Sequence, residues 1–180
     1  RGGANGSAIA VGEGAFAIGV GAQSGGDASH FNTIAIGTNA TATGNSAIAI
    51  GAGATATDNS TDPSNGAGYR SVALGVDATA RYDQATAVGA EARATGNKSS
   101  AFGFQANATA NITTAIGSTA RATEEGATAI GSQAAAINHF TTSVGRQAIA
   151  SGIQSTALGQ VARATSDQTV ALGVKASASG

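Results

Sequence analysis

A glycine recurs every 14 residues between Ser71 and Gly180, without a gap. One apolar residue precedes each of these glycines, and Ala stands three and five residues after it. The glycines of this run are Gly75, Gly89, Gly103, Gly117, Gly131, Gly145, Gly159 and Gly173. A fixed period of this length indicates a repeat protein made of stacked units, and it restricts the possible folds more than any other feature of the chain.

The same pattern continues upstream with less regular spacing. The glycine-to-glycine distance widens once to 18 and once to 24 residues, and the longer stretch holds the only Pro together with many Asp, Asn, Ser and Gly residues. Such residues are typical of surface loops, so we expect insertion loops at about 24–32 and 58–70. We expect residues 1–180 to form a single domain. Because the chain begins and stops inside repeats, we also expect it to be a fragment of a longer protein.

Within one unit, side chains alternate with period two on both sides of the glycine, as in residues 114–123 around Gly117. Strict alternation predicts strands, because successive side chains of a strand point to opposite faces. Glycine suits the corner between the two strands, since positive φ is accessible without a Cβ. The sequence therefore predicts an all-β fold, a parallel β-solenoid (β-roll) with coils of 14 residues.

The interior of such a coil must be thin. Aromatic residues make up 4% of the chain, and Met and Trp are absent. We expect small side chains to fill it, namely the Ala or Ser two residues before each glycine and the Ala residues three and five after it. The apolar residue just before the glycine then points outward. The reverse arrangement, with these apolar residues inside and the Ala columns outside, remains an alternative.

The outward apolar residues would form a continuous stripe when the coils stack. They are Ile36, Ile50, Leu74, Val88, Phe102, Ile116, Ile130, Val144, Leu158 and Leu172. A long exposed apolar stripe indicates an interface. Three stripes that meet on a common axis would close it, which predicts a homotrimer with these residues at the trimer interface.

A second outward column lies between the two Ala positions that follow the glycine. It consists of Thr41, Thr55, Thr79, Arg93, Asn107, Arg121, Ala135, Ile149, Arg163 and Ser177. The spaced arginines Arg93, Arg121 and Arg163 make this strip a candidate docking surface for an extended, fibrous ligand, which a ladder of similar sites would hold by avidity. A plain solvated sheet face is the alternative.

Charge and composition argue against several classes of function. The formal net charge is −1 and charged residues make up 11%, which argues against a nucleic-acid partner. The chain has no Cys, so disulfide and thiolate metal sites are excluded. We expect the only histidines, His30 and His139, to be surface residues, and we predict no catalytic, cofactor-binding or metal site.

The repeated units resemble the head repeats of the trimeric autotransporter adhesins, the YadA-like family. The resemblance lies in units such as Ser46-Ala47-Ile48-Ala49-Ile50-Gly51, followed by Ala54 and Ala56. It implies left-handed parallel β-rolls that trimerise and have no enzymatic activity. It also implies a place on the surface of Gram-negative bacteria, where such heads bind host extracellular-matrix proteins or cells. Membrane attachment would then use an anchor that is absent from these 180 residues.

Three other functions are compatible with a β-solenoid. Thr ladders on an Ala-rich coil suggest an ice-binding protein, and a purely structural spacer of a surface fibre needs no ligand at all. A left-handed β-helix acyltransferase would need a period of six residues and a catalytic His between subunits, so we rank it last.

Overall fold

The computed structural model describes residues 6–26, 31–57 and 70–180. The chain divides into two compact units, residues 1–95 and 96–180, and each is described here by itself. Most of the two expected insertion loops, together with His30, lies outside the described residues. That residues 1–180 form a single domain stays a prediction.

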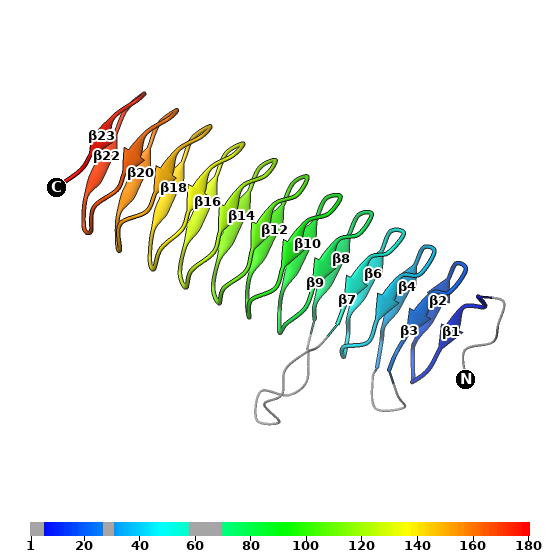
Figure 1. Ribbon diagram of the computed structural model, residues 1–180. Coiled ribbons are helices and arrows are strands. Elements are labelled where there is room, and N and C mark those ends of the chain that lie inside the picture. Colours follow the sequence, from blue (N-terminus) through cyan, green and yellow to red (C-terminus); the bar gives the residue numbers. More distant parts are fainter. Residues whose placement is uncertain (1–5, 27–30, 58–69) are drawn as a thin grey trace. The chain divides into compact units, whose positions relative to one another are not determined.

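The second unit is a parallel β-solenoid in which each coil adds one strand to each of two sheets (Figure 1). In the first sheet, which we call the long-strand sheet, the strands are β12 (Ser100–Phe102), β14 (Thr114–Ile116), β16 (Thr128–Ile130), β18 (Thr142–Val144), β20 (Thr156–Leu158) and β22 (Val170–Leu172). In the second, the short-strand sheet, they are β13 (Asn107–Ala108), β15 (Arg121–Ala122), β17 (Ala135–Ala136), β19 (Ile149–Ala150), β21 (Arg163–Ala164) and β23 (Ser177–Ala178). Every strand pairs in parallel with the strand one coil away, so Thr114 pairs with Thr128.

The first unit has the same construction. Its long-strand sheet contains β2 (Phe16–Ile18), β4 (Ile34–Ile36), β6 (Ile48–Ile50), β8 (Val72–Leu74) and β10 (Thr86–Val88). Its short-strand sheet contains β1 (Ile9–Ala10), β3 (Gln23–Ser24), β5 (Thr41–Ala42), β7 (Thr55–Ala56), β9 (Thr79–Ala80) and β11 (Arg93–Ala94). The longest interval between repeat glycines does not break the register, because Ile48 of β6 still pairs with Val72 of β8. The predicted parallel β-solenoid with 14-residue coils is therefore confirmed.

Hydrogen bonds between coils hold the backbone of each unit. The N–H of Gly131 donates to the carbonyl of Ile116 at 2.7 Å, and the N–H of Thr128 donates to the carbonyl of Thr141 at 2.8 Å. One coil therefore binds its neighbours on both sides through main-chain groups that any residue carries. The buried N–H and C=O groups along the strands thus find hydrogen-bond partners without any contribution from side chains.

The repeat glycine turns the chain from the long strand to the short strand. Gly117 has φ +129°, and a Cβ at this position would lie 2.6 Å from the carbonyl carbon and oxygen of Gly131 in the next coil. Both the backbone angle and the close approach of the next coil require glycine here. The sequence-based assignment of the glycine to this corner is confirmed.

Small side chains fill the interior, as expected. The Ala residues two before, three after and five after the repeat glycine are buried in nearly every coil, and Ala115, Ala120 and Ala122 have no exposed surface. The alternative that placed the Ala columns outside is wrong, because the space between two sheets joined by such short corners admits only small side chains, of which Thr is the largest that is fully buried.

A fourth interior column, four residues before the glycine, was not predicted. It carries Thr, Ser or Ala, and in the second unit the hydroxyl groups of Ser99, Thr113, Thr141 and Thr169 bond to the backbone of the second corner of the coil. Thr113 Oγ1 donates to the carbonyl of Ala110, and Thr141 Oγ1 donates to that of Asn138, both at 2.6 Å. These buried hydroxyls satisfy corner carbonyls that have turned away from the sheets.

The second corner contains left-handed residues other than glycine. Ile112, Phe140 and Gln154 occupy equivalent positions in three coils, with φ between 55° and 57°. Residues other than glycine rarely adopt this backbone conformation, and β-branched residues such as Ile adopt it least often. The conformation recurs at the equivalent residues Asn32 and Arg70, where the corner is longer, so it belongs to the entry into the next long strand and does not depend on side-chain type.

Candidate interaction surfaces

The apolar stripe lies on the outer face of the long-strand sheet. In the second unit, strand pairing places Phe102 beside Ile116 and Ile116 beside Ile130, and the same register continues to the end of the sheet through Val144, Leu158 and Leu172. Ile116 and Ile130 are 38% and 37% exposed, whereas Ala115 and Ala129 on the other side of the same strands are fully buried. The outward direction of these residues is therefore observed.

The first unit carries the same column on its own long-strand sheet. Ile36 pairs with Ile50, Ile50 with Leu74, and Leu74 with Val88. Ile50 is 39% exposed, and the others are half-buried by their neighbours in the column. That a second and a third subunit cover this stripe stays a prediction.

The two units differ in the column beside the stripe. In the first unit this column is apolar, with Phe16, Ile34, Ile48 and Val72, so both outer columns of that sheet are hydrophobic over most of its strands. In the second unit it consists of hydroxyl residues in register over the first five strands, Ser100, Thr114, Thr128, Thr142 and Thr156, and ends with Val170 in β22. This ladder is the feature behind the ice-binding alternative, but each of its members shares a strand face with a large apolar residue.

The three arginines predicted for a ligand surface point outward from the short-strand sheets. Arg93 lies in β11 of the first unit, and Arg121 and Arg163 lie in β15 and β21 of the second; all three are exposed. Between Arg121 and Arg163 the column continues through Ala135 and Ile149. Three coil spacings of about 4.8 Å separate the two arginine positions by roughly 14 Å.

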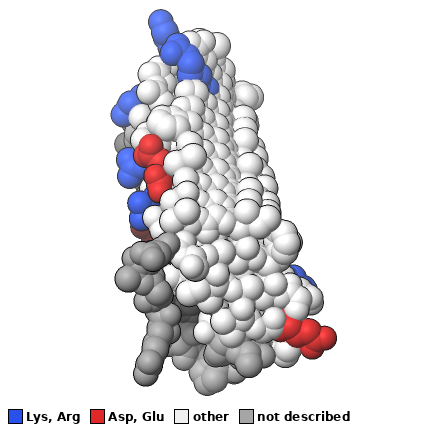
Figure 2. All heavy atoms as spheres, turned by 90° about the vertical axis from the view of Figure 1, so that its right-hand side faces the viewer, with Lys and Arg blue, Asp and Glu red and all other residues white. Residues whose placement is uncertain are grey.

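Charged side chains are sparse elsewhere on the surface. On the face drawn in Figure 2, most of the visible surface carries neither basic nor acidic side chains.

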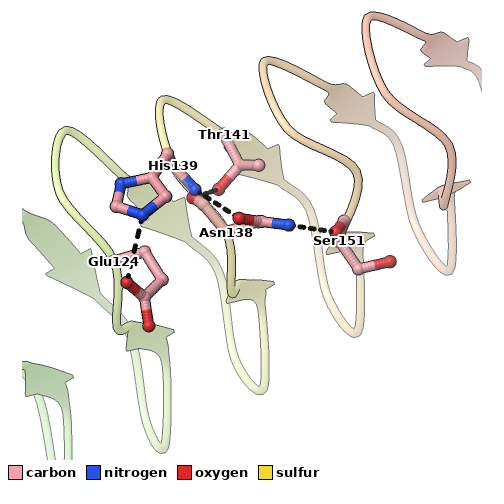
Figure 3. Close-up of polar contacts among 5 residues, drawn as sticks. All are labelled: Glu124, Asn138, His139, Thr141 and Ser151. Carbon is pink, nitrogen blue, oxygen red and sulfur yellow. Dashed lines mark hydrogen bonds and ion pairs between the residues drawn. The ribbon is translucent and has the colours of Figure 1, made fainter.

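His139 lies at the second corner of its coil and is held by local contacts (Figure 3). Its Nε2 lies 3.6 Å from Glu124 Oε2, and both side chains are nearly half exposed. Its backbone N–H donates to Asn138 Oδ1 at 2.9 Å, while Asn138 Nδ2 donates to the carbonyl of Ser151 in the next coil at 3.1 Å. His139 is thus a surface residue of a corner network, as predicted.

Other kinds of site find no support in the part of the chain that the structure describes. Among those residues, no group of three or more His, Cys, Asp or Glu side chains is placed to hold a metal ion. Within the same residues, no helix has the length and apolar character needed to cross a membrane.

Comparison with known proteins identifies the repeat. The family model of the YadA head domain repeat describes two copies of the repeat. It matches residues 31–54, 67–92, 94–111, 113–134, 136–162 and 164–180. Among solved structures, the chain is similar to the collagen-binding domain of the Yersinia adhesin YadA, with 21% sequence identity and a TM-score of 0.47. The similar region covers 74% of this chain and 62% of that domain. No curated protein sequence matches the chain. Because the family model covers most of its length, the chain belongs to the YadA head domain repeat family.

Proposed function

We propose that this chain is the head module of a bacterial surface adhesin, a homotrimer without enzymatic activity that attaches to host matrix proteins or host cells. The observation that carries the proposal is the outward stripe of large apolar residues, of which Ile116 and Ile130 are typical. A soluble solenoid that buries mainly Ala has little apolar volume of its own, so contact between stripes would supply the missing burial. In the full-length protein, an anchor outside these residues would hold the head at the Gram-negative outer membrane.

The outer face of the short-strand sheets is the proposed ligand surface. It carries Arg93 in the first unit, and Arg121 and Arg163 at separated coils of the second unit. Such spacing suits an extended ligand better than a compact one. Each contact on such a surface is weak, but several coils and three subunits together give high avidity. Collagen is the natural first ligand to test, since the similar Yersinia domain is named for binding it.

Binding of the full chain to immobilised collagen tests this proposal. The variant Arg93→Ala/Arg121→Ala/Arg163→Ala should bind at least tenfold more weakly than the wild type. The matched control is Arg81→Ala/Arg146→Ala/Lys175→Ala, which removes the same number of exposed charges outside the strip and should bind like the wild type.

Two results would contradict the proposal. Equal binding of the strip variant and the wild type would exclude the arginine strip as the ligand surface. A wild type that binds neither collagen nor other matrix proteins nor cultured host cells would exclude the adhesive function and would favour a structural spacer.

A further inference from the structure

A small open pocket lies at the second corner of the coils in the second unit. Its volume is about 160 Å³, and it is lined by Asn97, Lys98, Asn111, Ile112 and Glu125. These residues occupy equivalent corner positions in three successive coils. None of them belongs to the apolar stripe or to the arginine strip, so the pocket is separate from the surfaces described above.

The backbone around the pocket is held in place by hydrogen bonds between coils. The N–H of Ile112 donates to the carbonyl of Asn97 at 2.9 Å, and the N–H of Gly126 donates to that of Asn111 at 3.2 Å. Asn111 Oδ1 accepts a further bond from the N–H of Asn97 at 3.0 Å. The pocket is therefore preformed, and a ligand would not need to order its walls.

The lining residues offer both hydrogen-bond donors and acceptors. Lys98 supplies an ammonium group and Glu125 a carboxylate, while the Oδ1 atom of Asn97 is buried and has no hydrogen-bond partner in the structure. Because Asn111 uses its Oδ1 for the bond to Asn97, its Nδ2 is the group that it can offer as a donor. A ligand that matches this set needs several groups that can both donate and accept.

The charges of the lining residues cancel. Lys98 and Glu125 come from coils two apart, which corresponds to roughly 9.6 Å along the stack. A ligand with a net charge would be attracted by one and repelled by the other, so the pair favours an uncharged ligand. Between them lies the side chain of Ile112, which is 60% exposed and offers an apolar surface.

We infer that this pocket binds a single uncharged sugar unit. Each sugar hydroxyl can donate and accept hydrogen bonds, so it can satisfy the amide, ammonium and carboxylate groups together, and the C–H face of the ring packs on Ile112. The volume supports one unit rather than a longer oligosaccharide, since pockets for drug-sized ligands are about 300–1,000 Å³. The neighbouring corner cannot repeat the site, because it carries His139 and Phe140 at the equivalent positions.

Saturation-transfer NMR on the full chain tests the inference. The probes are methyl α-glucoside, methyl β-galactoside, methyl α-mannoside and N-acetylglucosamine, with glycine betaine as a zwitterionic probe of similar size. At least one sugar should show saturation transfer from the protein and bind with a millimolar dissociation constant. Glycine betaine should show no saturation transfer. The variant Lys98→Gln/Glu125→Gln should bind that sugar with a dissociation constant at least tenfold higher than that of the wild type.

The control variant is Lys175→Gln/Glu124→Gln, which makes the same changes in charge at residues that do not line the pocket. It should bind the sugar like the wild type. Sugar binding that survives Lys98→Gln/Glu125→Gln would place the ligand elsewhere and overturn the inference, as would binding of glycine betaine alone. Absence of binding by every probe would also overturn it, while leaving the adhesion proposal, which depends on other residues, unaffected.

Discussion

The ring of Phe140 occupies the space that a side chain at Gly126 would need. A Cβ built on Gly126 would lie 2.6 Å from Phe140 Cδ1. The two residues hold equivalent corner positions in adjacent coils, and both have left-handed backbone angles, φ +68° at Gly126 and 55° at Phe140. A glycine in one coil therefore makes room for a large side chain in the next.

The substitution Gly126→Ala should destabilise the chain for two reasons. The left-handed conformation costs a residue with a Cβ about 1–2 kcal/mol relative to glycine, and the contact with Phe140 adds to this cost. Chemical denaturation at one fixed protein concentration measures the change. In a Phe140→Ala background the cost of Gly126→Ala should fall to the backbone part alone. An equal cost in both backgrounds would show that the ring does not restrict position 126.

The thin interior predicts a sharp difference between two alanines only six residues apart. Ala129 is fully buried between the sheets, so Ala129→Val would force extra methyl groups into a filled space and cost about 1–3 kcal/mol. Ala135 points outward from β17, so Ala135→Val should change stability by less than about 0.5 kcal/mol. Similar losses for the two variants would refute the assignment of inside and outside.

The buried hydroxyl column predicts a specific role for Thr141. The substitution Thr141→Val keeps the shape of the side chain but removes the 2.6 Å bond to the carbonyl of Asn138, at a cost of about 1 kcal/mol. Thr141→Ser keeps the hydroxyl and should cost less. Thr142→Val, on the outer face of β18, is the control. If thermal unfolding shows the same loss of stability for Thr142→Val and Thr141→Val, the hydrogen bond of Thr141 does not contribute to stability.

Val161 should be a position where the chain can be stabilised. It has φ 60°, which is unfavourable for a β-branched residue, whereas Asn39 occupies the equivalent position with φ 56°. Asn tolerates this conformation, so Val161→Asn should gain about 1 kcal/mol and raise Tm by roughly 2–4 °C. The same substitution at Val170, an exposed strand residue, should give no gain. A Tm that falls with Val161→Asn would mean that lost side-chain contacts outweigh the relief of strain.

Much of the fold could be predicted because its strongest constraints repeat in every coil. Gly117 and its equivalents must be glycine because of their φ angle and the close approach of the next coil. Ala115 and its equivalents must be small because the interior has no room for larger side chains. Both positions therefore recur in the sequence at a fixed spacing. The hydroxyl column of Thr113 was missed because Thr, Ser and Ala alternate there, which hides its burial behind a polar composition.

The second corner and the sugar pocket could not be predicted. Ile112, Phe140 and Gln154 share one backbone conformation but no side-chain property, so composition gives no sign of the left-handed position. The pocket depends on which side chains of three coils lie side by side at this corner, including Lys98 and Glu125, which are far apart in sequence.

The mass of the full chain in solution tests most directly whether sister subunits cover the apolar stripe. Sedimentation equilibrium should give about 51 kDa, the mass of three chains of 17.0 kDa each. Replacing Ile116 and Ile130 by Asp should lower the mass to that of one chain, while Val76→Asp/Val174→Asp, outside the stripe, should leave it unchanged. A folded wild-type chain that sediments as a stable 17.0 kDa monomer would contradict the proposed interface.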